Sequence, residues 1–563
     1  MKQSILNLVL VIGIAIGLNV IGNHFYGYLD LTEEKRYTLT QPTQNLLQNL
    51  DDVVYVNVLL EGEFPAGFKR LQKATREILD DFRSISGYVE YEFEDPIPNS
   101  LPVEEKNNRI KQLQNDGLRA KNLRIRDGKE QKTIRCYPYA VLTYKGRSIP
   151  VDLVGEDIPG MSSHEALNNS VGLLEYKLSN AIQKLQTSRK PVIAFTSSHG
   201  ELPVANTQDI RNELRAFYDV GDVILDSLIQ INPGISVLIV AKPRAPFSEK
   251  DKFKIDQYVM NGGKVIWLMD ALNVTLDSIG VRGTYAPYPY VDNTFNLEDL
   301  LFKYGARLNN SLAMDLQSTS IPQIIDERGT QQLFPWPYHL VSIPNQDHPI
   351  TKSLGPVNLL FANTVDSIRT KTPVKKTFVL TTSERSKAQY FPMRLSFEVL
   401  KAKPDLATYN KSFLPLGLLL EGQFPSLYEN RPKGDFLEIY QQLGLEFKSS
   451  SVSTKMLVVA DGDIISNYAD ASQGRYLPLG VNRYQPKINF SNKDFLINAI
   501  EYMIDDNGVI AARSKEVKLR LLNETKAEEE ETKWQIINIV VPLLLLLLFG
   551  LGYNYWRRWK YAR

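Results

Sequence analysis

The amino-acid sequence predicts an α/β protein in which an N-terminal mixed α/β domain and a doubly wound α/β domain are flanked by two transmembrane helices. Three observations predict this class. Apolar runs of β type alternate with segments of helical periodicity, and two long stretches near the chain ends carry no charge. The 563 residues are also enough for about three domains.

Composition and charge exclude several classes of protein. Hydrophobic residues make up 43% of the chain, so most of it is expected to fold rather than remain disordered. The net charge of +1 provides no field that would attract nucleic acid, and we expect no nucleic-acid partner. Cys136 is the single cysteine, which excludes an intrachain disulfide, a cysteine-rich zinc site and a CxxC redox pair.

The first predicted transmembrane helix lies in residues 1–29. No charge occurs between Lys2 and Asp30, and the apolar stretch from Ile5 to Ile21 is long enough to cross a bilayer. A cleaved signal peptide is the alternative. It would have a shorter apolar region and end in small residues of the A-x-A type, which are missing here, so we expect an uncleaved anchor.

The second predicted transmembrane helix is 534–556. It contains six consecutive leucines, and aromatic residues bracket it on both sides, as is typical of membrane spans. A charged stalk, 511–533, precedes it, and a cationic tail, 557–563, follows. Because cations concentrate on the cytoplasmic side, the tail predicts that both termini are cytoplasmic and that the large region is periplasmic, at the inner membrane.

Residues 30–188 are predicted to form the N-terminal extracytoplasmic α/β domain. Residues 53–96 read as strand, helix, strand, and two hairpins follow, with turns at Asp127-Gly128 and Lys145-Gly146. This is a thioredoxin-like layout without its cysteines. Ser162 and Glu165 form a capping box before a long amphipathic helix, whose apolar stripe is expected to pack on its own domain rather than on a partner helix.

Residues 189–510 are predicted to form the doubly wound domain. The runs PVIAFT, GISVLIVAKP and KVIWLMD read as buried strands, and helical segments separate them. Such alternation indicates a parallel sheet covered by helices on both faces. A stretch near 275–350 is rich in Tyr, Pro and Asn, which predicts long ordered loops or an insertion.

Polar residues directly after these strands are the candidate ligand-binding residues, because ligands of doubly wound sheets lie beyond the carboxyl ends of the strands. The candidates are His199, Glu201, Asp270, Asp461 and Asp463. The alternative is that they cap helices and bond to loop backbone. We expect no metal, no cofactor and no catalytic residue. The G-x-S-x-G, phosphate-loop and G-x-G-x-x-G patterns are all missing, so we expect no enzyme activity.

Four segments carry a resemblance to a known family. They are RYTLTQPT, PVIAFTSSHGEL, HPITKSLGPVNLLFANTVDSI and VVADGDIISN. In this order they resemble the GldG-type proteins of Bacteroidetes, the auxiliary or substrate-binding component of the ABC transporter associated with gliding motility. The resemblance runs almost from end to end and includes both anchors.

The resemblance implies a class I glutamine-amidotransferase-like fold without the enzyme activity. In agreement, MDALN has no cysteine where an amidotransferase would place its nucleophile. It also implies a non-catalytic extracytoplasmic subunit, linked to gliding and surface-protein secretion. Its implied partners are a multi-span permease and, through it, a cytoplasmic ATPase. The alternatives are a structural scaffold for envelope or secretion machinery and a membrane-tethered envelope hydrolase.

Small and polar residues in the predicted spans are the candidate contacts with the permease. Gly13 and Gly17 form a G-x-x-x-G pair that permits close helix approach, and Asn19 and Asn538 could form interhelical hydrogen bonds. Whether a small-molecule ligand is bound, and which, is left open by the sequence.

Overall fold

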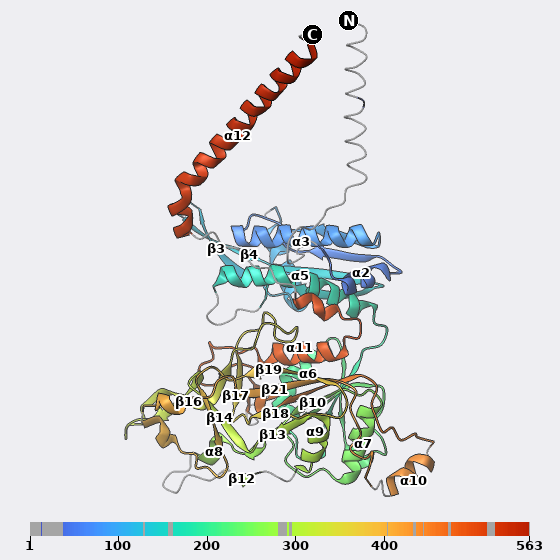
Figure 1. The fold of residues 1–563 in the computed structure, drawn as a ribbon. Helices are drawn as coiled ribbons and strands as arrows, with labels where there is room; N and C mark the ends of the chain where they lie inside the picture. The colour runs from blue at the N-terminus through green and yellow to red at the C-terminus, as the bar shows by residue number, and fades with distance from the viewer. Residues whose placement is uncertain are drawn as a thin grey trace. The chain divides into compact units, whose positions relative to one another are not determined.

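The computed structural model divides the chain into two compact units, Met1–Glu516 and Val517–Arg563. It describes residue 13 and residues 38–98, 100–127, 130–155, 162–279, 290–291, 295–401, 403–431, 435–442, 444–470, 474–514 and 524–561. The first predicted span, with Gly17 and Asn19, therefore lies outside the described residues apart from Gly13. The mixed α/β class is confirmed (Figure 1).

The N-terminal part is built on a four-stranded mixed sheet with the order β2-β1-β5-β6. Strand β1 pairs in parallel with β2 and antiparallel with β5, which pairs antiparallel with β6. A separate hairpin joins β3 to β4. The strand bounds are β1 Val54–Val58, β2 Val89–Phe93, β3 Lys121–Asp127, β4 Glu130–Cys136, β5 Tyr139–Tyr144 and β6 Arg147–Asp152.

Local signals in this part predicted the structure well. The turn between β5 and β6 has positive φ angles at Lys145 (46°) and Gly146 (76°), as a two-residue hairpin turn requires. Helix α5 begins with the capping box formed by Ser162 and Glu165, as predicted. The helices are α2 Gln41–Gln48, α3 Ala66–Ile85, α4 Val103–Asn115 and α5 Ser163–Gln186.

The apolar stripe of α5 packs into the core of this part of the chain, as expected. Its residues Leu174, Leu178, Ile182 and Leu185 are buried together with β1, α3 and β5 side chains. The N-terminal sheet and α5 therefore share one core. The comparison with a thioredoxin layout stays a prediction.

The second part is built on a seven-stranded sheet with the order β19-β21-β22-β10-β9-β7-β8. Strands β22, β10, β9, β7 and β8 are parallel, whereas β21 and β19 join antiparallel. The sheet is therefore mixed rather than wholly parallel. The bounds are β7 Val192–Thr196, β8 Asp219–Val223, β9 Ile235–Ala241, β10 Val265–Leu268, β19 Val374–Thr381, β21 Pro415–Gly422 and β22 Thr454–Val459.

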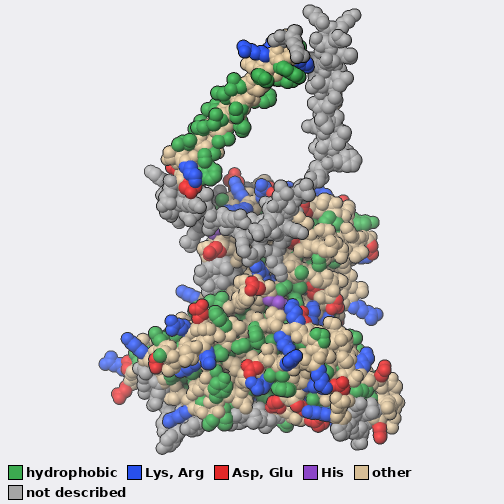
Figure 2. Space-filling model, in the orientation of Figure 1, with side chains coloured by type: hydrophobic (Ala, Val, Ile, Leu, Met, Phe, Trp, Pro, Cys, Tyr) green, Lys and Arg blue, Asp and Glu red, His purple; other side chains and the backbone are tan. Residues whose placement is uncertain are grey.

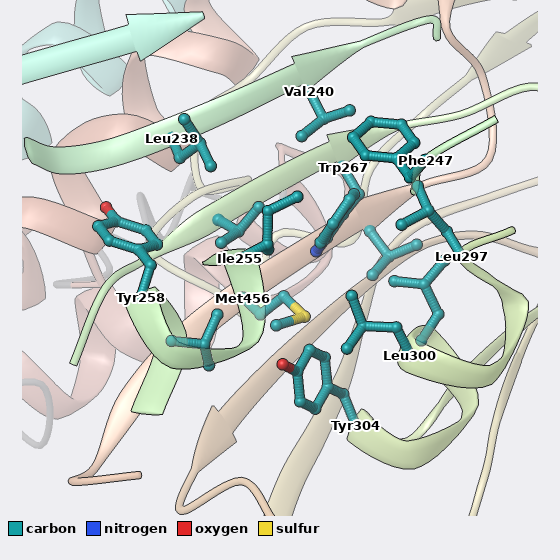
Figure 3. Close-up of a cluster of buried hydrophobic side chains, with 14 of the residues drawn as sticks. Leu238, Val240, Phe247, Ile255, Tyr258, Trp267, Leu297, Leu300, Tyr304 and Met456 are labelled. Carbon is teal, nitrogen blue, oxygen red and sulfur yellow. The ribbon is translucent and has the colours of Figure 1, made fainter. Parts of the chain in front are cut away.

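Alternate residues of the central strands enter two different cores, one on each face of this sheet. On one face, Trp267 of β10 and Met456 of β22 pack with α7 (Glu249–Met260) and α9 (Glu298–Tyr304) (Figure 3). On the other face, the sheet packs against α6 (Gln208–Arg215) and α11 (Asn492–Ile504) (Figure 1). Coverage of both faces by helices is confirmed.

The Tyr- and Pro-rich stretch near 275–350 contains regular structure as well as loops. Strands β15 and β16 form an antiparallel hairpin that continues into β17, and Trp336 of β16 is fully buried. The remaining elements of the unit are β11 Leu272–Asn273, α8 Leu276–Ile279, β12 Tyr290–Val291, β13 Ala306–Leu308, β14 Ser311–Asp315, β15 Ser318–Ile324, β16 Gln331–Ser342, β17 Val357–Leu360, β18 Val365–Ser367, β20 Ser386–Tyr390, α10 Asp435–Gln442, β23 Ala469–Asp470 and β24 Arg475–Tyr476.

The second unit contains helix α12, Glu524–Tyr561. Its portion Glu530–Tyr561 contains an 18-residue stretch with a mean hydropathy of 2.5 and is the one helix of the described residues that is long and apolar enough to cross a membrane. Hydrophobic side chains cover much of it (Figure 2), and Asn538 is among its exposed residues. Part of the predicted stalk is thus helical and continuous with the predicted span.

Candidate functional site

The five predicted side chains lie at one edge of the seven-stranded sheet. His199 and Glu201 follow β7, Asp270 follows β10, and Asp461 and Asp463 follow β22. Because these strands are parallel, their carboxyl ends meet at the same edge. Within that edge the residues form two groups, one around Lys242 and one around His199.

Lys242 is the centre of the first group. It follows β9, is 9% exposed, and its ammonium lies 3.3 Å from Asp270 Oδ2 and in contact with Asp463 Oδ1. Burial alone would lower the pKa of Lys242, but the charges of Asp270 and Asp463 outweigh burial and raise it. Lys242 therefore carries a charge that links the ends of β10 and β22.

Arg244 connects the two groups. Its Nη2 lies 3.0 Å from Asp270 Oδ2, and its backbone N–H donates to the carbonyl oxygen of His199 at 2.7 Å. Gly200 makes this approach possible, because its φ is +69° and a Cβ atom there would lie 3.2 Å from Cβ of Arg244. The loop after β7 is thereby held against the loop after β9.

Asp461 and Asp270 bond to loop backbone. Asp461 is fully buried and accepts from the N–H groups of Leu360 (2.8 Å) and Asp463 (2.7 Å), while Asp270 accepts from the N–H of Gly462 (2.6 Å). Burial and the negative charges of Asp463 and Asp270 raise the pKa of Asp461. These contacts are those of the alternative in which strand-end carboxylates fix loops.

His199 is the centre of the second group. Its ring is buried and stacks on Phe247 with 3.7 Å between the ring centroids. Nδ1 lies 3.0 Å from Ser198 Oγ, and Nε2 lies 3.5 Å from Asp251 Oδ2. Glu201 accepts from the backbone N–H of His199 at 2.6 Å. The carboxylates that form ion pairs with His199 are thus Glu201 and Asp251, and none of the three predicted aspartates is among them.

A family model described as "ABC-type uncharacterized transport system" matches residues 190–499, which is more than half of the 563 residues. The chain belongs to this family. The match covers the seven-stranded sheet and all five strand-end residues. A second family model, for a domain of unknown function, matches residues 33–143.

Membership of this transport-system family makes the chain a transport-associated protein, of a kind that is in general not enzymatic. Together with the apolar helix α12, it supports association with a membrane. An uncharacterized protein of Borreliella burgdorferi is 20% identical over 534 residues, which cover 93% of this chain and 92% of that protein. The similarity therefore extends beyond the seven-stranded domain.

Two solved structures show weak similarity. The N-terminal domain of mmIFT52 has a TM-score of 0.31 and 13% identity, covering 56% of this chain and 97% of that one. The exo-β-1,4-mannosidase Op5Man5 from an Opitutaceae bacterium has a TM-score of 0.20 and 12% identity, covering 79% of this chain and 54% of that one. TM-scores this low support no statement about the fold or function of this family member.

Sequence reasoning missed Lys242, Arg244 and Asp251 as members of the site. Lys242 and Arg244 stand directly after the apolar run GISVLIVA, so the rule that selected the other strand ends would also have selected them. Asp251 lies in the first turn of α7, where it bonds to the N-cap residue Ser248. Its second contact, with His199, comes from the fold.

In this transport-family protein the carboxylates of the first group already have partners within the protein. Asp270 and Asp463 are paired with Lys242 or Arg244, and Asp461 is bonded to backbone. A cavity of about 1060 Å³ lies elsewhere, lined by residues of α5 and α11 such as Lys184 and Glu501, and it contains none of the five predicted residues. Of the described groups, His199 with Asp226 and Asp251 has the geometry to hold a metal ion.

Proposed function

We propose that this chain is a non-catalytic, membrane-anchored subunit of an ABC-type transport complex, with its globular region in the periplasm. The observation that carries the proposal is the family match over residues 190–499 in a chain that also carries the apolar helix α12. A domain held at a membrane beside a transporter can bind substrate or pass on a conformational change.

A multi-span permease and a cytoplasmic ATPase are the proposed partners. The sequence has no phosphate loop with which to hydrolyse ATP, and one or two helices do not form a transport pathway. The resemblance to GldG-type proteins narrows the proposal to the gliding-motility and surface-protein-secretion systems of Bacteroidetes. A non-catalytic role also accords with strand-end carboxylates that are occupied by lysine, arginine and backbone partners.

Affinity purification from native membranes in a gentle detergent tests the partners. We expect a permease and an ATPase to be recovered with the tagged chain. Asn538→Leu should lower permease recovery by about threefold if Asn538 forms an interhelical hydrogen bond, whereas the neighbouring Ile539→Leu should not. Recovery of envelope or secretion proteins without any permease or ATPase would favour the scaffold and contradict the proposal.

Cysteine labelling tests the orientation. Cys136 is 1% exposed and burial raises its pKa to about 12, so the native thiol should stay unlabelled and the unmodified chain is the control. Single cysteines at the exposed Ser449 and at the C-terminus are treated with an impermeant reagent on spheroplasts. Labelling at 449 alone is expected, and labelling of the tail alone would refute a periplasmic globular region.

A further inference from the structure

A second set of ligating side chains lies where the carboxyl ends of β8, β7 and β9 meet. His199 follows β7, Asp226 lies in the short 3₁₀ helix after β8 (Leu225–Ser227), and Asp251 lies in the first turn of α7 after β9. One ligand atom from each lies within 4.8 Å of the others. Strand β8 pairs with one edge of β7, and β9, the next strand along the chain, pairs with the other edge of β7. The strand order therefore reverses at β7, and ligands of doubly wound folds bind at such a switch point.

The spacing of these atoms suits a small metal ion. Two ligands of a tetrahedral Zn²⁺ ion, each about 2.05 Å from the metal, are about 3.4 Å apart. The separation between His199 Nε2 and Asp251 Oδ2 is 3.5 Å. A metal ion fits between these two atoms without a change in their separation, and Asp226 completes a set of one nitrogen and two oxygen ligands.

The imidazole ring is held so that Nε2 points at the carboxylate. Phe247 stacks on the ring with an interplanar angle of 5°, and Ser198 Oγ lies beside Nδ1. Glu201 Oε1 is 3.8 Å from Nδ1, is buried, and makes no hydrogen bond among the described residues. The hydrogen-bond partner of Nδ1 is thus Ser198, whereas Glu201 positions the residue by accepting from the backbone N–H of His199 and places a negative charge behind the ring.

The charges around His199 favour a cation. Three carboxylates, those of Glu201, Asp226 and Asp251, face one ammonium, that of Lys254, which lies 2.8 Å from Asp251 Oδ1. Hydrogen bonds from Lys254 Nζ at 2.8 Å and from Ser248 Oγ at 2.6 Å hold the Asp251 carboxylate in place. Asp226 is exposed, which gives an ion a route from solvent.

We propose that His199, Asp226 and Asp251 bind a divalent transition-metal ion, with Zn²⁺ preferred, and that Glu201 orients the histidine. A mixed imidazole and carboxylate set favours zinc over magnesium or calcium, which prefer oxygen ligands only. The ion joins the ends of three neighbouring strands. The proposal departs from the expectation of no metal and does not depend on the transport function proposed above.

Calorimetric titration of the purified full-length chain with Zn²⁺, in detergent, after chelator treatment and with a tag that contains no histidine, tests the proposal. We expect one Zn²⁺ per chain, and with Co²⁺ the visible absorption of a four-coordinate site. Cys136 is buried with a pKa of about 12, so a thiolate will not bind the probe. Millimolar Mg²⁺ should not compete.

Asp226→Asn is the decisive variant, since its side chain is exposed and the fold should survive. It should weaken Zn²⁺ binding at least 10-fold, and Glu201→Gln should weaken it by about 10-fold. Asp219→Asn, at the opposite end of β8, is the matched control and should bind as the wild type does. Absence of Zn²⁺ binding, or binding unchanged in Asp226→Asn, would overturn the proposal.

Discussion

Replacing Lys242 with methionine removes the charge that joins the ends of β10 and β22. The ammonium of Lys242 lies 3.3 Å from Asp270 Oδ2, and their side chains are 10% and 6% exposed. At this distance the attraction between unit charges is about 5 kcal/mol for an effective dielectric constant of 20, and the cost of burying the charges offsets much of it. The variant, however, leaves a buried carboxylate behind.

Removing one partner of a buried ion pair costs about 3–5 kcal/mol. Arg244 still holds Asp270 in the variant, and Asp463 is 25% exposed and can be solvated, so we expect about 3 kcal/mol. Methionine matches lysine up to the ε position, lacks the ammonium nitrogen, and is equally unbranched at Cβ. The positive φ of 53° at this position therefore costs both side chains the same, and the comparison isolates the charge.

The assay is urea unfolding of the full-length chain, followed by tryptophan emission as the buried Trp267 and Trp336 become exposed. Lys264→Met is the control, because Lys264 pairs with Asp506, whose side chain is 81% exposed, and such surface pairs contribute about 0–1 kcal/mol. A loss for Lys242→Met no greater than that for Lys264→Met would refute the view that Lys242 holds the strand ends together.

Two further substitutions test other contacts. Burial would raise the pKa of Glu501, but the charge of Lys184 outweighs burial and the pKa is lowered. The pair therefore stabilises the fold fully above the unfolded-state pKa of about 4.3. This stabilisation is lost as the pH falls through the lower pKa of the folded state. Glu501→Gln should thus cost about 2 kcal/mol in urea unfolding at pH 7 and less at pH 3.5, and an equal cost at both would refute this sign. Gly462→Ala places a Cβ atom 2.7 Å from Cβ of Lys242 and should cost about 1–3 kcal/mol, whereas Gly221→Ala meets nothing within 4 Å and should be neutral, so equal melting temperatures would contradict the packing argument.

The features that sequence reasoning predicted correctly depend on residues close together in the chain. The capping box of Ser162 and Glu165 and the turn at Lys145-Gly146 are each specified within four residues. Burial of alternating apolar runs is equally local. These signals fix which segments become helices and strands.

The direction in which strands pair and the contacts between distant residues could not be predicted from such local patterns. The run FLPLGLLLEG is apolar whether its strand, β21, joins the sheet parallel or antiparallel, and the sequence does not distinguish the two. The stretch FPWPYH looks like a loop because proline cannot donate a ladder hydrogen bond, yet it lies in β16. Pro335 is tolerated there because it lies next to a register shift in the pairing with β15.

The candidate site shows the same division. Parallel strands bring their carboxyl ends together, so the rule placed His199, Asp270 and Asp461 at the correct edge. The same rule could not predict which of these side chains contact one another, because those contacts depend on which loops cross between the strands. Arg244, bonded to both His199 and Asp270, determines that grouping, and Asp226 reaches His199 from a loop that sequence reasoning did not consider.

Charge balance separates the two groups at this edge. Around Lys242, two cations meet Asp270 and Asp463, and the raised pKa of Asp461 favours its neutral form, so no further cation is needed. Around His199, three carboxylates face one ammonium. Loss of the Lys242 charge should therefore lower the free energy of unfolding while leaving Zn²⁺ affinity unchanged. Loss of the exposed Asp226 carboxylate beside His199 should weaken Zn²⁺ binding and leave the free energy of unfolding without metal nearly unchanged. A buried ion pair contributes to stability, whereas a metal ligand contributes to metal affinity.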